Sequence, residues 1–131
     1  MSKIQPKIKN PRILLIEDDT FLSGMYVTKL GLENFEVALA SDGKQGLKMA
    51  LEEQPDLILL DIILPKLDGF EILKAVRKDK NTKNIPVILL TNLGQKDDVE
   101  RGLSLGATDY LIKAHFMPSE VVDKIKRLIK K

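Results

Sequence analysis

The sequence of 131 residues contains no cysteine and only one histidine. The lack of cysteine excludes disulfide bonds, a thiol nucleophile and a cysteine-bound zinc site. A single histidine excludes a metal site built mainly from imidazoles. Any catalytic chemistry must therefore come from carboxylates, hydroxyls and amines.

Long hydrophobic runs are also missing, since the longest apolar stretches, such as residues 13–16 and 57–60, have four residues. Such runs are too short for a membrane-spanning helix or the core of a signal peptide. We therefore expect a cytoplasmic protein without membrane insertion. The length and the 44% hydrophobic and 31% charged fractions are typical of one globular domain.

Basic and acidic side chains are unevenly distributed along the sequence. Residues 1–12 and 124–131 contain basic side chains and no acid, whereas residues 13–123 contain nineteen acidic and twelve basic residues. Basic ends can attract nucleic acids or membranes, but no aromatic or arginine cluster accompanies them here. Nucleic-acid binding is therefore not expected.

Short apolar runs alternate with segments of helical periodicity, which favours an α/β fold. The continuous runs in the first, third and fourth predicted strands indicate burial on both faces, whereas Phe35, Val37 and Leu39 alternate like an edge strand. Five such units predict a doubly wound five-stranded parallel sheet with five helices over residues 12–131. Residues 1–11, with two prolines and no period, predict a flexible basic extension. The predicted strands are residues 12–17, 34–40, 56–61, 85–91 and 108–113.

Two helices have clear patterns. The last begins at Pro118 or Ser119 and has one apolar and one lysine-rich face. The first is weakened by Gly24, because glycine destabilises a helix by about 1 kcal/mol relative to alanine. Leu22, Met25, Tyr26 and Leu30 nevertheless form an apolar stripe along it.

Polar side chains gather where the predicted strands end, which is the edge of a parallel sheet that binds ligands. If the strand order is 2-1-3-4-5, the first and third strands are neighbours and the carboxylates of Asp18 and Asp61 converge. Either one carboxyl then has a raised pKa, or a cation lies between them. Hard oxygen ligands favour Mg²⁺. The residues at these strand ends are Glu17, Asp18, Asp19, Asp61, Thr91 and Lys113.

Four segments carry a family resemblance: ILLIEDD at the first strand, PDLILLDIILPKLDGFE across the third, PVILLT at the fourth and GATDYLIK at the fifth. Together they resemble the CheY-like receiver domain of bacterial two-component response regulators, over residues 12–131. The resemblance implies a flavodoxin-like sheet of order 2-1-3-4-5.

The resemblance further implies that Asp61 is the phosphoacceptor, a carboxylate nucleophile that takes a phosphoryl group from a sensor histidine kinase or phosphotransfer protein. Mg²⁺ would be bound by the carboxylates of Asp18 and Asp61 and by the backbone carbonyl of Ile63. Glu17 would bind it directly or through water. Lys113 would neutralise charge on the phosphoryl oxygens. Such a protein is no enzyme beyond its own phosphorylation and dephosphorylation.

In the family, a threonine and an aromatic residue form the switch, and Thr91 and Tyr110 match them. Output would come from the segment 92–106 and from the face of the fourth helix, fifth strand and last helix, which binds an unknown downstream protein and allows a dimer. Since the last helix runs to Lys131, we expect a stand-alone, single-domain response regulator.

Three positions depart from the family pattern. Ala114 replaces the usual proline after Lys113, so that peptide is either trans with a shifted loop or a strained cis bond. Asn92 is larger than the usual residue after the switch threonine, and Ile63 places an apolar side chain where water would approach Asp61. Both hint at slow loss of the phosphoryl group.

Other interpretations remain open. Asp19 or Thr20 can cap the first helix, Asp68 and Gly69 fit a helix start, and Tyr110 can be a simple edge aromatic. His115 is assigned no role. An aspartyl phosphatase would need an aspartate where Ile63 stands, and a nucleotide binder would need a less acidic first loop. An interaction or nucleic-acid-binding module on the same fold is the remaining alternative.

Overall fold

The computed structural model describes residues 10–129, in which strands and helices alternate. Most of the predicted extension over residues 1–11 lies outside the described part, so the division into an extension and a domain over 12–131 stays a prediction. The strands are β1 (Arg12–Ile16), β2 (Glu36–Ala40), β3 (Leu57–Leu60), β4 (Val87–Thr91) and β5 (Asp109–Ile112). The helices are α1 (Thr20–Leu32), α2 (Gly43–Glu53), α3 (Gly69–Lys78), α4 (Lys96–Ser104), the 3₁₀ helix η1 (Lys113–His115) and α5 (Pro118–Ile129).

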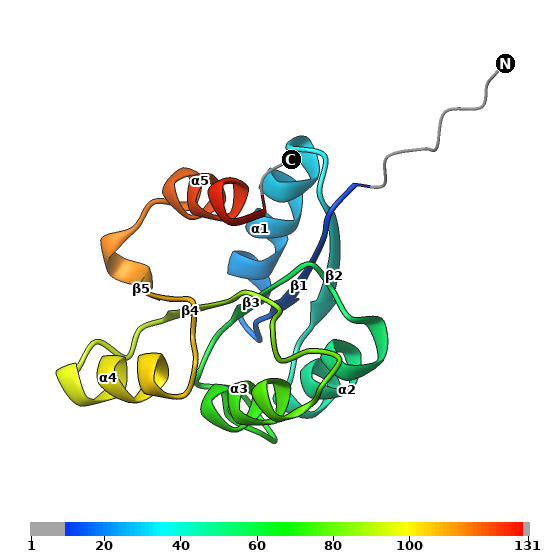
Figure 1. The fold of residues 1–131 in the computed structure, drawn as a ribbon. Helices are drawn as coiled ribbons and strands as arrows, with labels where there is room; N and C mark the ends of the chain where they lie inside the picture. The colour runs from blue at the N-terminus through cyan, green and yellow to red at the C-terminus, as the bar shows by residue number, and fades with distance from the viewer. Residues whose placement is uncertain (1–9, 130–131) are drawn as a thin grey trace, which may run out of the picture.

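All strand pairs are parallel, and the sheet order is β2-β1-β3-β4-β5. Helices α1 and α5 cover one face of the sheet, while α2, α3 and α4 cover the other (Figure 1). The predicted fold class and strand order are therefore confirmed. None of the helices in residues 10–129 has the length and apolar character needed to cross a membrane.

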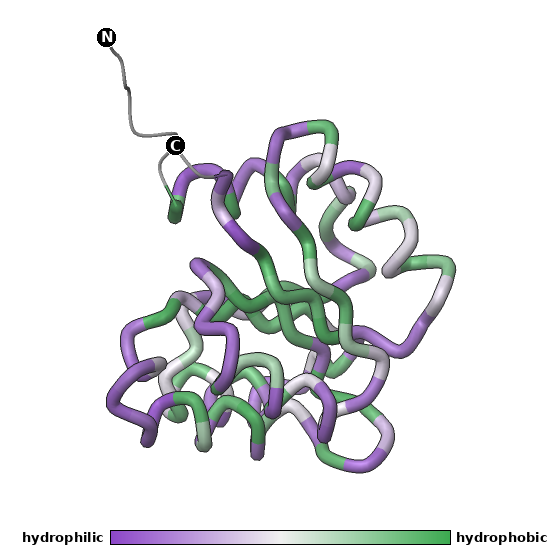
Figure 2. Tube along the Cα trace, turned by 90° about the vertical axis from the view of Figure 1, so that its right-hand side faces the viewer, coloured by the Kyte–Doolittle hydropathy of each residue, from purple (hydrophilic) through white to green (hydrophobic). Residues whose placement is uncertain are grey.

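The core consists of two layers, one on each face of the sheet. Every residue of β3 and β4 is buried, as is β1 after its first residue, which agrees with their continuous apolar runs. The tube in Figure 2 shows these strands as a mostly hydrophobic band between the helix layers. β2 lies at the sheet edge as predicted, but Leu39 on it is 40% exposed while Ala40 is buried.

Each strand is shorter than predicted: β1 at its end, β2 and β4 at their start, and β3 and β5 at both ends. Asn34 has a φ of 67°, in the left-handed region, and therefore cannot begin β2. Glu17, Asp61 and Lys113 lie just beyond their strands instead of within them. Glu17 and Asp61 still donate their N–H groups to the neighbouring strand at 3.0 and 3.1 Å, so their side chains are anchored at the sheet edge.

Helix starts fix the loops around this edge. Asp19 is the N-cap of α1, and its carboxylate accepts a hydrogen bond from Leu22 N at 3.0 Å. Asp68 caps α3 in the same way. Gly69 follows directly, and a Cβ placed there would lie 2.4 Å from the carbonyl oxygen of Asp61. The absence of a side chain at Gly69 thus lets α3 begin against the end of β3.

Two glycine substitutions should therefore have opposite effects on the free energy of unfolding. Gly69→Ala should lower it by about 1–3 kcal/mol, because the new methyl group collides with backbone. Gly24→Ala, whose Cβ would meet nothing within 4 Å, should raise it by about 0.5–1 kcal/mol. Urea unfolding followed by circular dichroism measures both. Equal effects from the two variants would contradict this view of how α3 packs.

Candidate functional site

Three carboxylates meet beyond the ends of β1 and β3. Ligand oxygens of Glu17, Asp18 and Asp61 all lie within 4.8 Å of one another. Glu17 and Asp61 are buried, whereas Asp18 is exposed. The convergence of Asp18 and Asp61 that we expected from the strand order is therefore present, and it follows directly from the parallel pairing of β1 with β3.

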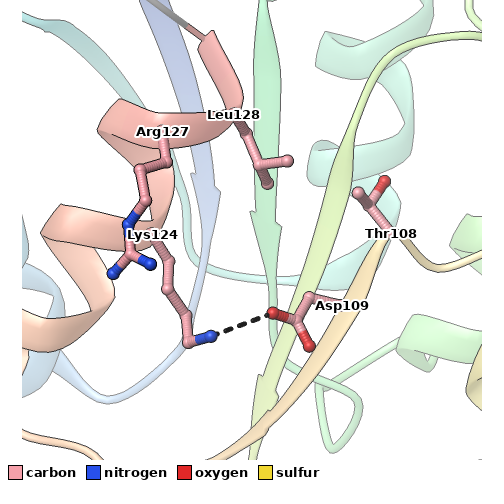
Figure 3. A pocket seen from close by; sticks show the side chains of 5 residues that line it. All are labelled: Thr108, Asp109, Lys124, Arg127 and Leu128. Atoms are coloured by element: carbon pink, nitrogen blue, oxygen red, sulfur yellow. Dashed lines mark ion pairs between the residues drawn. The ribbon is translucent and has the colours of Figure 1, made fainter.

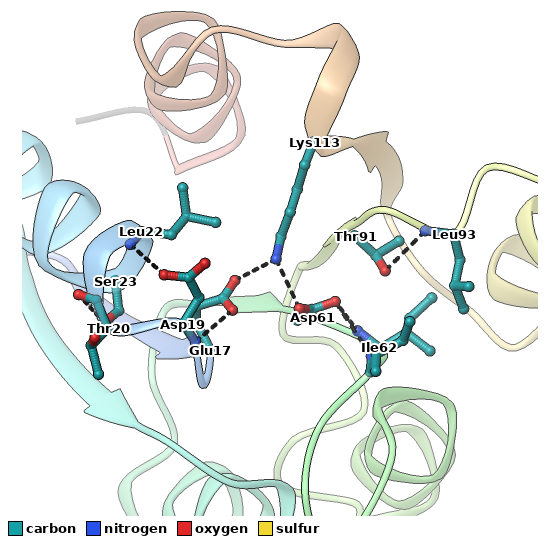
Figure 4. Close-up of polar contacts among 11 residues, drawn as sticks. Glu17, Asp19, Thr20, Leu22, Ser23, Asp61, Ile62, Thr91, Leu93 and Lys113 are labelled. Carbon is teal, nitrogen blue, oxygen red and sulfur yellow. Dashed lines mark hydrogen bonds and ion pairs between the residues drawn. The ribbon is translucent and has the colours of Figure 1, made fainter.

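Lys113 reaches this cluster from the end of β5. Its Nζ lies 2.8 Å from Glu17 Oε1 and 2.9 Å from Asp61 Oδ2, as the two dashed lines in Figure 4 show. The peptide between Lys113 and Ala114 is trans, as are all others in the described chain. Lys113 reaches both acids without the proline that usually follows it in the family.

The two carboxylate oxygens of Asp61 have different partners. Oδ1 accepts hydrogen bonds from the backbone N–H groups of Ile62 at 2.7 Å and Ile63 at 3.4 Å. Oδ2 accepts the hydrogen bond from Lys113. The carboxylate is therefore held in one orientation by backbone groups that follow β3 and by the lysine that follows β5.

Glu17 is the most deeply enclosed acid of the site, with 3% of its surface exposed. Burial raises the pKa of Glu17 above its ordinary value, and the hydrogen bonds from Lys113 and the Asp19 N–H only partly oppose this. For Lys113, burial lowers the pKa, but the contacts with Glu17 and Asp61 outweigh it and raise the pKa overall. The lysine thus stays protonated and balances part of the acidic charge.

A pocket of about 420 Å³ opens over the carboxylates. Its wall includes Ile63 and Asn92, and the Ile63 side chain is 58% exposed at the mouth. All the charged acceptors in the pocket are carboxylate oxygens, the ligand type that Mg²⁺ prefers. The residues present therefore fit a hard divalent cation. The full lining is Glu17, Asp18, Asp19, Asp61, Ile63, Asn92 and Lys113.

Thr91 and Tyr110 are brought together through the backbone of Leu93. The Thr91 hydroxyl accepts a hydrogen bond from Leu93 N at 3.3 Å, and the Tyr110 hydroxyl donates one to Leu93 O at 2.6 Å. Figure 4 shows Thr91 joined to Leu93 and not to Asp61. Sequence reasoning missed Leu93 because it takes part only through its backbone, which leaves no side-chain signal.

The comparisons with known proteins agree with this arrangement. The family model for the response regulator receiver domain matches residues 13–126. The chain belongs to the response regulator receiver domain family. It has a TM-score of 0.85 and 33% identity to the receiver domain of the Francisella response regulator 1452, with 92% of this chain and 98% of that chain covered. Receiver domains interact with histidine kinases or phosphotransfer proteins and generally use Mg²⁺.

Curated relatives of this receiver domain are longer proteins. It is 41% identical over 121 residues to the DNA-binding dual master transcriptional regulator RpaA of Synechocystis, covering 92% of this chain and 50% of RpaA. It is 38% identical over 122 residues to the alkaline phosphatase synthesis transcriptional regulatory protein PhoP of Bacillus subtilis, covering 93% of this chain and 50% of PhoP. The chain thus spans about half the length of the curated relatives that it matches.

Glu17→Gln should raise the free energy of unfolding of the receiver domain at pH 7. Because burial gives Glu17 a raised pKa in the folded state, its contribution to stability is greatest at low pH and is lost as pH rises through that pKa. The advantage of the glutamine variant should therefore vanish below the ordinary carboxyl pKa of 4.5. Urea titrations from pH 4 to pH 8 measure the difference.

The exposed Glu52 provides the matched control, and Glu52→Gln should change stability by less than about 0.5 kcal/mol at every pH. A Glu17→Gln variant less stable than the native protein at pH 7 would show that the pair with Lys113 outweighs the burial of the charge.

Proposed function

We propose that this receiver domain accepts a phosphoryl group on Asp61 from the phosphohistidine of a sensor histidine kinase or phosphotransfer protein. The observation that carries the proposal is the fixed carboxylate of Asp61, oriented by Ile62 N and Lys113 Nζ at the floor of an open pocket. In the reaction, a carboxylate oxygen attacks phosphorus as the phosphorus–nitrogen bond of the donor breaks.

Mg²⁺ would be held by the carboxylates of Asp18, Asp61 and Glu17, with the carbonyl of Ile63 as a further ligand. When bound, it would neutralise charge on the phosphoryl oxygens. The three clustered carboxylates support this assignment. One structure similar to this chain is the Mn²⁺-bound form of response regulator Rcp1, with a TM-score of 0.81 and 29% identity over 92% of this chain and 96% of that chain.

Lys113 and Thr91 would act on the transferred group. Lys113 lies 2.9 Å from Asp61 and has the length to follow a phosphoryl oxygen added there, where its positive charge stabilises the anion. Thr91, on the strand next to β3, would offer its hydroxyl to the same group after releasing Leu93 N.

The release of Leu93 would couple phosphorylation of Asp61 to a change at the surface. Tyr110 bonds to the carbonyl of Leu93, so a shift of this backbone would change the packing of Tyr110 against α4. The output surface would then be the face formed by α4, β5 and α5, which would bind the downstream protein or a second copy of the chain.

A pocket of about 170 Å³ lies on the α5 side of this output face (Figure 3). Lys124 on α5 pairs with Asp109 on β5 at 3.4 Å, and Arg127 lies beside them. Partly buried charges of both signs beside the exposed Arg127 suit a polar contact with a protein partner.

Incubation with phosphoramidate and Mg²⁺ should add one phosphoryl group to the protein, detected as a mass increase in intact-protein mass spectrometry. Asp61→Asn should abolish the addition, because an amide is not a nucleophile of this kind. The matched control is Asp56→Asn at the other end of β3, which should react like the native protein. Unchanged modification of Asp61→Asn would refute the assignment.

Ile63 and Asn92 should make the phosphorylated state long-lived. The apolar side chain of Ile63 at the pocket mouth keeps water from the phosphoryl group, and the larger side chain of Asn92 narrows the access. Ile63→Asn should shorten the half-life of the aspartyl phosphate by at least about threefold, which corresponds to a small reduction of the activation free energy of hydrolysis. Release of inorganic phosphate from the isolated phosphoprotein measures the half-life.

Leu32→Asn is the control for an exposed apolar side chain far from the pocket, since Leu32 is 77% exposed at the end of α1. It should leave the half-life unchanged. Equal half-lives for Ile63→Asn and the native protein would remove Ile63 from this role.

A further inference from the structure

Tyr26 is a buried tyrosine of α1 that the proposed mechanism does not use. Only 3% of its surface is exposed, and it packs in the core layer between α1, α5 and the sheet, with Leu15 and Leu111 among its cluster. A phenylalanine or leucine would fill an apolar site of this kind without bringing a hydroxyl into it. The hydroxyl of Tyr26 therefore calls for an explanation.

The Tyr26 hydroxyl makes no hydrogen bond with any residue from 10 to 129. Buried polar groups are nearly always hydrogen-bonded. A buried polar group without a protein partner indicates a functional role or a bound water molecule. The other tyrosine of the chain, Tyr110, does have a partner, the carbonyl of Leu93 at 2.6 Å.

The Tyr26 ring lies on the side of the sheet to which Glu17 and Lys113 point. Side chains alternate along a strand, so Glu17 continues the row of Ile13 and Leu15, which pack in the same layer as Tyr26. Lys113 continues the row of Leu111, which is also in this layer. The lysine and its acidic partner therefore stand at the open end of the layer that holds Tyr26.

The direction of α1 favours a ring that leans toward that end. Side chains on a helix lean toward its N-terminus, and α1 begins at Thr20, directly after the acidic loop. The charges of Lys113 and Glu17 both act on the Tyr26 hydroxyl. Burial raises the pKa of Tyr26 to about 12, with attraction to Lys113 lowering it and repulsion from Glu17 raising it.

We propose that Tyr26 is a positioning residue for the Lys113–Glu17 pair, whose hydroxyl donates a hydrogen bond to Glu17 when Lys113 turns from Glu17 to a phosphoryl group on Asp61. Glu17 is buried and has two donors, Lys113 Nζ and the Asp19 N–H. Departure of Lys113 would remove the hydrogen-bond donor of Oε1, which is costly for a buried carboxylate even when a bound cation shares its charge. The hydroxyl of Tyr26 fills that position and makes the movement of Lys113 easier.

The part of this proposal that concerns phosphorylation rests on the proposed function, but the hydrogen bond itself can be tested without it. Lys113→Met removes the charge and keeps most of the length of the side chain, so the Tyr26 hydroxyl should then donate to Glu17 permanently. Tyr26→Phe should lower the folding equilibrium constant by about tenfold in the Lys113→Met background, the size of a hydrogen bond to a charged group. In the native background Tyr26→Phe should change this constant by less than about twofold, because the hydroxyl has no hydrogen-bond partner in residues 10–129 to lose.

Urea unfolding at pH 8 in the presence of EDTA measures all four proteins of this double-mutant cycle, with divalent cations kept from Glu17. Ser23→Ala is the matched control, since Ser23 is a buried hydroxyl of the same helix that donates back to Thr20 O at 3.3 Å. It should have the same effect in both backgrounds. If Lys113→Met prevents folding, Lys113→Gln replaces it in the cycle.

Equal effects of Tyr26→Phe in the two backgrounds would overturn the proposal, as would a tenfold loss of stability already in the native background. As a second readout, Tyr26→Phe should slow phosphorylation of Asp61 by phosphoramidate at least about threefold. Ser23→Ala should not slow it. Failure of the native protein to be phosphorylated would instead refute the proposed function, while the double-mutant cycle would still test the hydrogen bond of Tyr26.

Discussion

The contact of Lys113 Nζ with both Glu17 and Asp61 is the interaction on which the rest of the site depends. Parallel strands place their carboxyl ends at one edge, and here that edge holds acids from both β1 and β3. Two buried carboxylates at this separation repel each other, and they are tolerated because a lysine from β5 lies between them. The site is therefore a balance of charge across three strands that are far apart in the sequence.

The sheet has the rigidity that this balance requires. β1 and β3 are buried on both faces by helices, so the loops that carry the acids start from fixed positions. Asp19 and Asp68 tie the following helices to the same loops by capping them. The acidic edge is therefore strained electrostatically but well defined geometrically, which is what phosphoryl transfer demands of a protein.

The fold class and strand order could be predicted from the sequence, and so could the meeting of Asp18 and Asp61 at one edge of the sheet. Continuous apolar runs identified the central strands, and the polar residue after each run marked the sheet edge. The strand ends were less accurate, because Asn34 adopts a left-handed conformation and Glu17, Asp61 and Lys113 lie one residue beyond the ladder. An apolar pattern does not distinguish the last paired residue from the first one after it.

Contacts made through backbone atoms were beyond sequence reasoning. Nothing in the side chain of Leu93 indicates that its N–H and carbonyl join Thr91 to Tyr110. Tyr26 was assigned to the apolar stripe of the first helix from its spacing, and its burial agrees with that assignment. The spacing does not show that its hydroxyl lacks a hydrogen-bond partner within residues 10–129, because this depends on how the surrounding layer packs. The roles of Asp61, Lys113 and the metal ligands stay predictions.

A crystal structure of the protein grown with Mg²⁺ tests the central claim most directly. The account predicts one ion in contact with a carboxylate oxygen of Asp18 and one of Asp61, with Lys113 still beside Asp61. Asp18 and Asp61 turned away from each other, with no ion between them at a saturating concentration of Mg²⁺, would contradict it.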